Sequence, residues 1–361
     1  MDAKKIVEID GSYLEGGGQA LRNALSLSCI LGKPVRVVKI RANRPNPGLS
    51  RQHLHGLNLL RDITNADVVG NYLLSSTVEF TPGTIVDNTY RVETHTAASI
   101  TLIYQMALPV LLFAGRSSRL IVCGGTNVDF APPVEYMQDV LLPNLKHFGA
   151  SFDLKVQRYG FYPRGQGRCQ LDVEPVAKLN PGKIVAFGSI KSVSGVAYCA
   201  GRLPVNIAID MQQSAQREIH RMWPSQECNI EPIKHSRQKA YYDGAGILMT
   251  VNTTADVVLG ASALGKKRID GHLLGLEVSC QLGGYIREKV CVDNYMQDQL
   301  IIYMSLAVGR STIRTGKLTN HTRTAINVAE QMTGVKFDVA MEPDGQVLVS
   351  CQGLGHLNKL I

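Results

Sequence analysis

The sequence lacks the short patterns that most often assign chemistry to a chain. None of its eight cysteines forms a CxxC pair, no HExxH or similar histidine spacing occurs, and no Gly-Lys-Ser/Thr follows its glycine triplet. A dinucleotide-binding glycine fingerprint is also missing. These absences argue against a dedicated zinc site, a Walker-type phosphate loop and a Rossmann-type cofactor site.

Long apolar runs are missing as well. Residues 1–5 contain no apolar core of a signal peptide, and the most apolar run, residues 100–114, is interrupted by Gln105 and Pro109 and is too short to span a bilayer. The cysteines stand mostly within apolar stretches, which is typical of buried, reduced thiols. We therefore expect an intracellular protein with no membrane partner.

The composition is that of a folded, mildly basic protein. Its 361 residues are 45% hydrophobic, enough for the core of one large domain or two ordinary ones. The formal net charge of +8 favours encounters with polyanions, but it says nothing about chemistry. Composition alone does not distinguish a protein that binds polyanions from an ordinary basic enzyme.

One supersecondary pattern recurs along the chain. Three times, an apolar helical pattern ends at a glycine that is followed by a basic residue and a β-branched strand. Such repetition predicts an α/β fold built from a duplicated βαβ-type module. The expected helices and strands are residues 19–31 with 35–40, 97–114 with 120–123, and 297–308 with a strand around residue 313.

The segment 186–290 breaks this rhythm. It combines a polar helical pattern at 205–222 with a hairpin at 246–252 and 257–262, and an exposed basic turn at 265–268. We read it as an inserted second domain, so that residues 1–185 and 291–361 form the core.

A glycine-rich segment near the N-terminus is the strongest candidate for a binding site. Glu15 and the triplet Gly16–Gly18 precede the helix at 19–31, whose first turns would carry Gln19 and Arg22. Free backbone N–H groups at a helix N-terminus, combined with several guanidinium groups, can bind phosphate. A plain tight turn with solvated arginines remains the alternative. The further basic residues come from the next strand and loop: Arg41, Arg44 and Arg51.

Two other loops have the composition of ligand sites. The loop at 160–167 could present Arg164 and two aromatic rings to a nucleotide or an RNA strand, or it could be an ordinary hairpin turn. The loop at 124–133 is equally ambiguous. Loops at equivalent ends of repeated units tend to converge on one cleft.

His321 stands out among the nine histidines. It follows Asn320 at the start of a helical pattern, and the positive end of a helix dipole keeps an imidazole neutral and able to attack phosphorus. A simple helix cap is the alternative. Polar residues that begin the last repeat, at 293–299, could likewise bind a ribose or base, or only cap their helix.

With these residues assembled, the chain closely resembles the RNA 3'-terminal phosphate cyclases. The resemblance runs from Ile9 nearly to the C-terminus, and the chain retains both the glutamate-glycine block and the histidine that inactive cyclase-like proteins lack. The motifs are Asp10-Gly11, Glu15 to Gln19 with Arg22, Ile40 to Ala42 with Arg44, Pro47 to Leu49, Arg51 to Leu54, Gly124 to Asn127, Tyr295 with Asp298 to Leu300, and His321-Thr322 with Thr324-Ala325.

The resemblance implies a core of repeated βαβαββ units, like those of the enolpyruvyl transferases, with one small inserted α/β domain. It implies an ATP-dependent ligase-type reaction that converts an RNA 3'-terminal phosphate to a 2',3'-cyclic phosphodiester. The route passes through a covalent histidine-AMP intermediate and an RNA-(3')pp(5')A anhydride. ATP with Mg²⁺ or Mn²⁺, an RNA ending in a 3'-phosphate, and a nuclear as well as cytoplasmic location follow from the same likeness.

The resemblance also assigns roles to individual residues, with His321 as the nucleophile that receives AMP. Glu15 is expected to contact the metal. The residues that match the ATP pocket, besides His321, are Gln105, Pro132, Tyr295, Asp298 and Gln299. Those that match groups binding the phosphates of ATP or the RNA end are Arg22, Arg41, Arg44 and Gln52.

Two other functions remain open on the sequence. A non-catalytic RNA-binding factor in ribosomal RNA processing would need the basic surface but no nucleophile. An enolpyruvyl transferase would use the same arginines on a small anionic metabolite and would depend on phosphoenolpyruvate.

Overall fold

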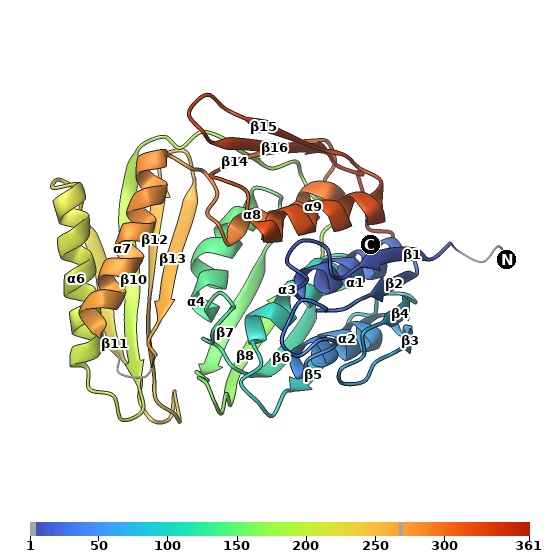
Figure 1. Cartoon of the computed structure of the whole chain (residues 1–361), viewed down its shortest axis with the longest axis horizontal. Coiled ribbons are helices and arrows are strands. Elements are labelled where there is room, and N and C mark those ends of the chain that lie inside the picture. The colour runs from blue at the N-terminus through green and yellow to red at the C-terminus, as the bar shows by residue number, and fades with distance from the viewer. Residues whose placement is uncertain (1–4, 267–269) are drawn as a thin grey trace.

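Three stretches of the chain repeat the order βαβαββ in the computed structural model, which describes residues 5–266 and 270–361 (Figure 1). The first consists of β1 (Val7–Asp10), α1 (Gln19–Leu31), β2 (Val35–Val38), α2 (Arg51–Thr64), β3 (Asp67–Val69) and β4 (Val78–Thr81). The second consists of β5 (Thr89–Glu93), α3 (Ile100–Leu111), β6 (Ser118–Gly124), the helical run α4 (Val134–Tyr136), η1 (Met137–Leu141) and α5 (Leu142–Lys146), β7 (Phe152–Arg158) and β8 (Gly167–Val173). The third consists of β9 (Lys183–Ile184), α8 (Met296–Leu306), β14 (Arg310–Thr315), α9 (Asn320–Thr333), β15 (Phe337–Met341) and β16 (Val347–Gln352).

The three stretches also share one sheet topology. Their strand orders are β1-β2-β4-β3, β5-β6-β8-β7 and β9-β14-β16-β15. In each sheet the first pair is parallel and the other two pairs are antiparallel. The predicted α/β fold of repeated βαβαββ units is therefore confirmed.

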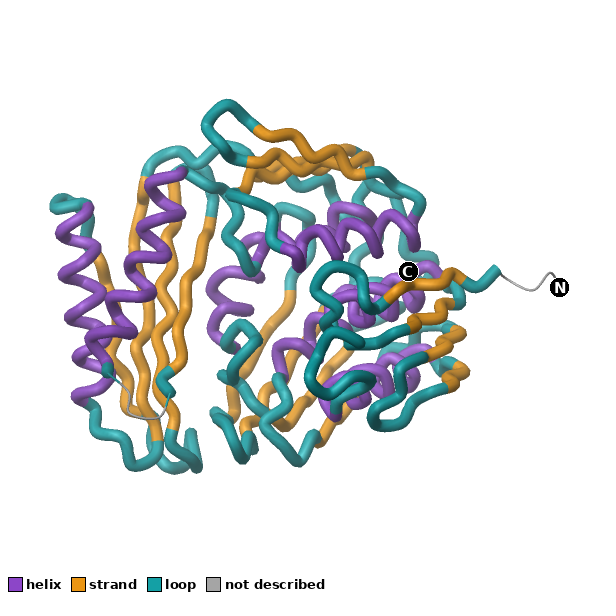
Figure 2. The backbone as a smooth tube through the Cα atoms, viewed as in Figure 1, coloured by secondary structure: helices purple, strands orange, loops and turns teal. Residues whose placement is uncertain are grey.

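A fourth sheet is formed by the segment between β9 and α8. It contains β10 (Ile190–Ala200), α6 (Asn206–Met222), β11 (Cys228–Lys234), β12 (Gly244–Thr253), β13 (Val258–Leu264) and α7 (Gly271–Glu288). The strand order is β11-β10-β12-β13, and α6 and α7 pack together on the sheet (Figure 2). The expected hairpin is β12 with β13. We propose that this part is the inserted domain, 186–290, and call it the insert.

The helices of the repeats bring their N-termini toward one another. In α1, apolar residues such as Leu21 and Leu25 are buried, and the helix ends at Gly32, which adopts a left-handed conformation with φ of 60°. This helix packs against α2, α3 and α9, and α9 packs against α8. Since α1 and α9 belong to the first and third repeats, segments some 300 residues apart in the chain become neighbours.

Several local expectations need correction. The strand expected at 35–40 ends at Val38, because Lys39 (φ of 50°) turns the backbone out of the extended region. The helix expected at 97–114 spans Ile100–Leu111, and the side chain of Ser99 caps it. Phe161 is buried, so the 160–167 loop exposes one ring and not two. In the expected basic turn at 265–268, the lysine and arginine at 267 and 268 lie outside the described residues.

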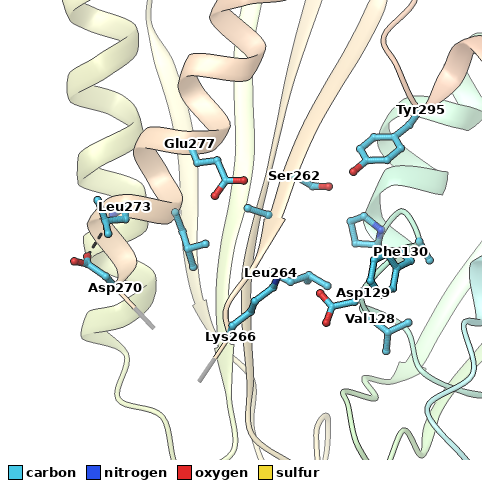
Figure 3. A pocket seen from close by; sticks show the side chains of 14 residues that line it. Val128, Asp129, Phe130, Ser262, Leu264, Lys266, Asp270, Leu273, Glu277 and Tyr295 are labelled. Atoms are coloured by element: carbon cyan, nitrogen blue, oxygen red, sulfur yellow. Dashed lines mark hydrogen bonds between the residues drawn. The ribbon is translucent and has the colours of Figure 1, made fainter. Parts of the chain in front are cut away.

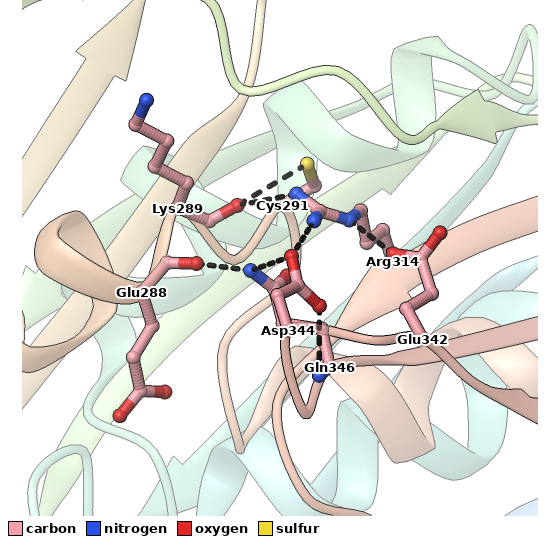
Figure 4. A network of polar contacts seen from close by, with 7 residues as sticks. All are labelled: Glu288, Lys289, Cys291, Arg314, Glu342, Asp344 and Gln346. Carbon is pink, nitrogen blue, oxygen red and sulfur yellow. Dashed lines mark hydrogen bonds and ion pairs between the residues drawn. The ribbon is translucent and has the colours of Figure 1, made fainter.

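A polar network fixes the point where the chain returns from the insert to the third repeat (Figure 4). The guanidinium group of Arg314 on β14 pairs with both Glu342 and Asp344. The amide of Gln346 donates to the carbonyl oxygen of Glu288, the last residue of α7. The third repeat therefore holds the end of the insert through Gln346 and through Arg314, whose Nη1 donates to the carbonyl oxygen of Lys289 at 3.3 Å.

All eight cysteines are free. Six of them are buried, Cys228 is partly buried and Cys280 is exposed, in agreement with the expectation of reduced and mostly buried thiols. In the described ranges, no helix combines the length and the apolar character needed to cross a bilayer.

Candidate active site

His321 occupies the first turn of α9, and a buried network fixes that turn. The side chain of Thr319 caps the helix by accepting from the backbone N–H of Thr322 at 3.1 Å. Gln297 of α8 accepts from the Thr319 N–H at 3.0 Å and from the Thr322 hydroxyl at 2.7 Å. Gln297 is itself fully buried. The position of His321 is thus set by two helices, and the prediction that it lies at a helix N-terminus is confirmed.

The imidazole of His321 has one nitrogen engaged and one available. Its Nδ1 lies 2.8 Å from Oε2 of Glu15, while about half of the side chain, 49%, remains exposed. Because a carboxylate can only accept, we assign the proton of the neutral ring to Nδ1, which leaves a lone pair on Nε2. Burial lowers the pKa of His321, and the charges of Arg22 and Arg44 lower it further, against the opposing effect of Asp298. A neutral, nucleophilic ring at pH 7 is the result.

Glu15 supplies the carboxylate beside this ring. Its Oε1 pairs with the guanidinium group of Arg44, and its buried Oε2 faces Nδ1 of His321 but meets no other donor among the described residues. An oxygen with an unused lone pair fits a cation, and Mg²⁺ is often held by one or two carboxylates together with substrate phosphates. In the described part of the chain no three His, Cys, Asp or Glu side chains gather as a metal site. Glu15 would therefore hold such an ion together with substrate phosphates and not within an all-protein cage.

The glycine triplet lets basic groups approach the backbone at the start of α1. A Cβ atom on Gly18 would lie 2.1 Å from Nε2 of His53 and 3.0 Å from Nη1 of Arg22. A Cβ atom on Gly17 would lie 3.0 Å from Nη2 of Arg44. Any side chain at these positions would therefore displace the groups that surround the helix N-terminus. Two guanidinium groups and free N–H groups converge there, as an anion site requires.

A short relay connects α1 with α8. Arg22 donates to Oε1 of Gln19 at 2.6 Å, and Nε2 of Gln19 donates to Oδ2 of Asp298 at 2.7 Å. Burial raises the pKa of Asp298 to about 6, although the charges of His321 and Arg22 act in the opposite direction. Burial also lowers the pKa of Arg22 to about 10, so its guanidinium group stays charged at neutral pH.

His53 belongs to this site, a role that sequence reasoning missed. It is buried on α2, its Nδ1 lies 2.6 Å from the hydroxyl of Ser50, and it contacts Gly18. Burial, together with the charges of Arg22 and Arg41, lowers the pKa of His53 to about 3. His53 is therefore a neutral side chain that lies beside Arg22 and Arg41. Its position within the Arg51 to Leu54 motif is the sequence feature that could have identified it.

Two of the predicted phosphate-binding residues also support the scaffold. Arg41 donates from Nη1 to the carbonyl oxygens of Asn46 and Gly48, at 2.8 and 2.9 Å, and so closes its own loop. Oε1 of Gln52 accepts from the N–H of Ser99 at 3.0 Å, while no hydrogen bond of its amide NH₂ is found among the described residues. Arg41 therefore stabilises its own loop, and Gln52 joins α2 to the start of α3.

A cleft of about 470 Å³ opens between the 128–133 loop and the insert, and Tyr295 forms part of its wall (Figure 3). Tyr295 precedes α8 by one residue, so Asp298 follows it one helical turn later. Pro133 lines the same cleft, and the carbonyl oxygen of its neighbour Pro132 accepts from Thr101. Of the two positions predicted for ATP, Tyr295 lines this cleft, whereas Pro132 is not among its lining residues and lies next to one of them.

The other two residues predicted for ATP are placed less directly. Gln105 is partly buried on α3, and its amide finds no hydrogen-bond partner in the described ranges, so it is free to bind a ligand. The amide of Gln299 donates to the carbonyl oxygen of Tyr295 at 2.8 Å, within its own helix. The described contacts therefore do not bring these two side chains into the cluster around His321.

Asp293 connects three parts of the molecule at the start of α8. This fully buried carboxylate accepts from the Tyr136 hydroxyl at 2.6 Å and from the N–H of Gly260, in the insert, at 2.9 Å. It also caps α8 by accepting from the N–H groups of Tyr295 and Met296, both at 3.0 Å. The ring of Tyr136 meets that of Tyr295 edge to face at 5.9 Å. We call this set the Asp293 junction.

Removing one donor from the Asp293 junction should be costly. Tyr136→Phe keeps the ring but leaves the buried carboxylate short of a hydrogen bond, so we expect the free energy of unfolding to fall by about 1.5–3 kcal/mol. Urea denaturation of the parent and the variant measures this difference in the free energy of unfolding. Tyr104→Phe is the matched control, because the buried Tyr104 hydroxyl reaches the Leu120 carbonyl only over 3.4 Å. Equal losses in the two variants would contradict a special role for the junction.

Comparison with known proteins gives a consistent result. The family described as RNA 3'-terminal phosphate cyclase matches residues 13–339. A protein of Drosophila melanogaster named RNA 3'-terminal phosphate cyclase is 89% identical over 361 residues, 100% of both chains. A protein of Pyrobaculum aerophilum with the same name is 37% identical over 350 residues, 97% of this chain and 99% of the relative.

Among solved structures, the enolpyruvyl transferase NikO from Streptomyces tendae aligns with a TM-score of 0.39 and 10% identity, over 96% of this chain and 48% of that one. The family match extends over most of the chain, and the two relatives are matched over almost their whole length. The chain therefore belongs to the RNA 3'-terminal phosphate cyclase family.

Proposed function

We propose that this protein uses ATP to convert an RNA 3'-terminal phosphate into a 2',3'-cyclic phosphodiester, through a His321-AMP intermediate and an RNA-(3')pp(5')A anhydride. One observation carries the proposal. His321 is a neutral imidazole whose Nδ1 faces Glu15, whose Nε2 is free, and which lies beside Arg22 and Arg44. A nucleophile, an orienting carboxylate and phosphate-binding cations are the parts that nucleotidyl transfer needs.

In the first step, the lone pair of His321 Nε2 attacks the α-phosphorus of ATP. An N–P bond forms, the P–O bond to pyrophosphate breaks, and the ring becomes positively charged. Glu15, 2.8 Å from Nδ1, stabilises this charge, and Asp298 adds a second negative charge nearby. Arg22 and Arg44 bind the oxygens that become more negative as pyrophosphate departs.

The second and third steps use the activated adenylate. An oxygen of the RNA 3'-phosphate attacks the phosphorus of His321-AMP, the N–P bond breaks, and Nε2 recovers its lone pair. The 2'-hydroxyl oxygen then attacks the terminal phosphorus of the anhydride, AMP leaves, and the hydroxyl proton is released. Because the hydroxyl is adjacent, proximity lowers this last barrier by roughly 7 to 11 kcal/mol.

ATP and a divalent cation would share this site. Tyr295, which lines the cleft, and Pro132, Gln105 and Gln299 are the residues we propose for the nucleoside. A Mg²⁺ or Mn²⁺ ion held by Glu15 would neutralise charge on the triphosphate. The buried Oε2 of Glu15, which meets no donor besides Nδ1 of His321 in the described part of the chain, supports this assignment.

Acidification should slow the first step through Asp298. The pKa of this carboxyl is raised to about 6, so its negative charge is present above that pH and is lost below it. We therefore expect the rate of His321 adenylylation to fall with a midpoint near pH 6. Single-turnover labelling, with ATP labelled on its α-phosphate, measures this across pH.

Asp298→Asn separates this titration from that of the histidine. The amide keeps the shape and the bond to Gln19 Nε2 but carries no charge at any pH, so the variant should be slow throughout and lack the midpoint near pH 6. Only the titration of His321, whose pKa lies below its ordinary value, should remain. A variant with the parent's midpoint would show that Asp298 does not control the step.

A further inference from the structure

Two loops from different parts of the fold are tied together at the edge of the insert. They are residues 158–167 of the second repeat and residues 234–243 of the insert, here called the paired loops. The N–H of Tyr159 donates to the carbonyl oxygen of Lys239 at 2.7 Å. Arg158 stacks on Tyr241 at 4.4 Å from the ring centre, donates to its hydroxyl at 2.9 Å, and donates to the carbonyl oxygen of Gln166 at 2.6 Å.

A small apolar cluster beneath the paired loops holds them rigid. Phe161, Tyr198 and Ala240 are buried against one another, apart from the main core. The rings of Phe161 and Tyr198 stack at 6.0 Å, and those of Tyr159 and His235 stack at 4.0 Å. The surface above this cluster is therefore preorganised, so a ligand could bind there without ordering the loops first.

That surface combines exposed rings with unused positive charges. Tyr162 is 76% exposed and Tyr241 is 52% exposed. Arg164, Arg237 and Lys239 are exposed, and none of them forms an ion pair or a side-chain hydrogen bond in the described part of the chain. Rings that offer a face, interleaved with free cations, are the combination that binds single-stranded nucleic acid.

We infer that the paired loops bind the single-stranded RNA upstream of the 3'-phosphate. Bases stack on Tyr162 and Tyr241, and Arg164, Arg237 and Lys239 bind the backbone phosphates. The inference rests on the proposed function, in which RNA is the substrate. It assigns binding of the RNA away from its 3' end to the insert and the second repeat. Charge complementarity favours this polyanion over other occupants, given the formal net charge of +8.

Two clefts with a shared lining connect the paired loops with Tyr295. A cleft of about 560 Å³ is lined by Tyr162, and it shares part of its lining with the cleft that contains Tyr295. Phe130, which is fully exposed and has a φ of 65°, lines the cleft that contains Tyr295 (Figure 3). The residues common to both clefts are Val128, Asp129, Leu264 and Lys266.

The charges along this path differ from those of the paired loops. The cleft beside Tyr295 is lined by Asp129, Asp270 and Glu277, with Lys266 as the cation among its described lining residues. Carboxylates repel phosphates but accept hydrogen bonds from the amino groups of bases. Phosphate attraction is therefore concentrated on the paired loops, and substitutions there should affect long RNA selectively.

The test compares two RNAs that end in a 3'-phosphate, of about 4 and about 16 nucleotides. The parent, Tyr162→Ala, and the triple variant Arg164→Gln, Arg237→Gln, Lys239→Gln are titrated by fluorescence anisotropy at several salt concentrations. Tyr162→Ala should weaken binding of the long RNA roughly 10-fold through the lost stack. The triple variant should make the salt dependence of log K shallower by about 2, since each phosphate contact contributes about 0.7. The short RNA and adenylylation by ATP alone should be unchanged.

Matched substitutions elsewhere serve as controls. Tyr72→Ala removes another exposed ring, in the first repeat, and Lys183→Gln removes another exposed charge, on β9. Neither should affect RNA binding. The inference is overturned if the paired-loop variants bind the long RNA as tightly as the parent does, a result that would favour an acidic protein as the partner of this surface. It is also overturned if the affinities for the long and the short RNA fall equally. Failure of the parent to adenylylate would instead refute the proposed function, because length-dependent binding is measured without ATP.

Discussion

His321→Asn should abolish covalent labelling by ATP carrying a label on its α-phosphate, and cyclisation should fall at least about 10⁴-fold, as happens when a covalent nucleophile is removed. Asparagine matches the length of the ring to Nδ1 but offers no nitrogen lone pair at the position of Nε2. The loss is in the chemical step, so ATP binding should persist. Labelling followed by mass spectrometry of the modified peptide measures it.

The same experiment separates the proposed reaction from a non-catalytic role in RNA binding. The fold of the variant should be intact, because α9 is capped by Thr319 and held by Gln297, and the histidine itself is half exposed. Thermal unfolding within a degree or two of the parent would verify this. A parent that never labels would favour the non-catalytic RNA-binding factor, and label on the His321→Asn variant would refute the nucleophile.

Arg22→Gln should produce the second largest loss, about 10²–10³-fold in the rate of adenylylation, which is the usual effect of removing one charged or preorganised donor from a transition state. Arg22 faces the glycine triplet, and its charge is retained at neutral pH. Glutamine can still reach Gln19 but cannot neutralise pyrophosphate. Single-turnover labelling at saturating ATP isolates this step.

Two further substitutions make the Arg22 result specific. Arg22→Lys restores the charge without the planar fork and should recover only part of the rate. Arg116→Gln removes an exposed guanidinium group from the loop before β6 and should leave adenylylation unchanged. If the lysine variant is no faster than the glutamine variant, geometry outweighs charge at this position. If Arg116→Gln is equally slow, the effect is a general one of basic charge and not of Arg22.

The repeated fold could be predicted because each unit carries its own local signals. The helix at Gln19–Leu31 was placed to the residue, since Gly32 and the following Pro34 mark its end. Strand ends were less predictable: β2 stops at Val38, where left-handed residues begin, although the apolar pattern continues. The orientation of Phe161 was also missed, because its burial depends on Tyr198, which belongs to another part of the chain.

The site could be predicted only in part, and for a related reason. Composition and spacing pointed to Arg22 and His321, which lie at helix starts that the sequence marks clearly. Pairings between distant segments leave no such trace. The bond between Gln19 and Asp298 joins residues 279 positions apart, and the pairing of Glu15 with His321 requires the first and third repeats to pack. The resemblance supplied the roles of these residues, and the folded chain supplied their partners.

The Asp293 junction would couple a movement of the insert to the cleft that contains Tyr295. Its four bonds reach the insert through Gly260, the second repeat through Tyr136, and the start of α8, beside the cleft, through Tyr295 and Met296. A displacement of the insert must therefore break one of these bonds or carry Tyr295 with it. Any cooperativity transmitted this way is reciprocal: if bound RNA increases the affinity for ATP by some factor, bound ATP increases the affinity for RNA by the same factor.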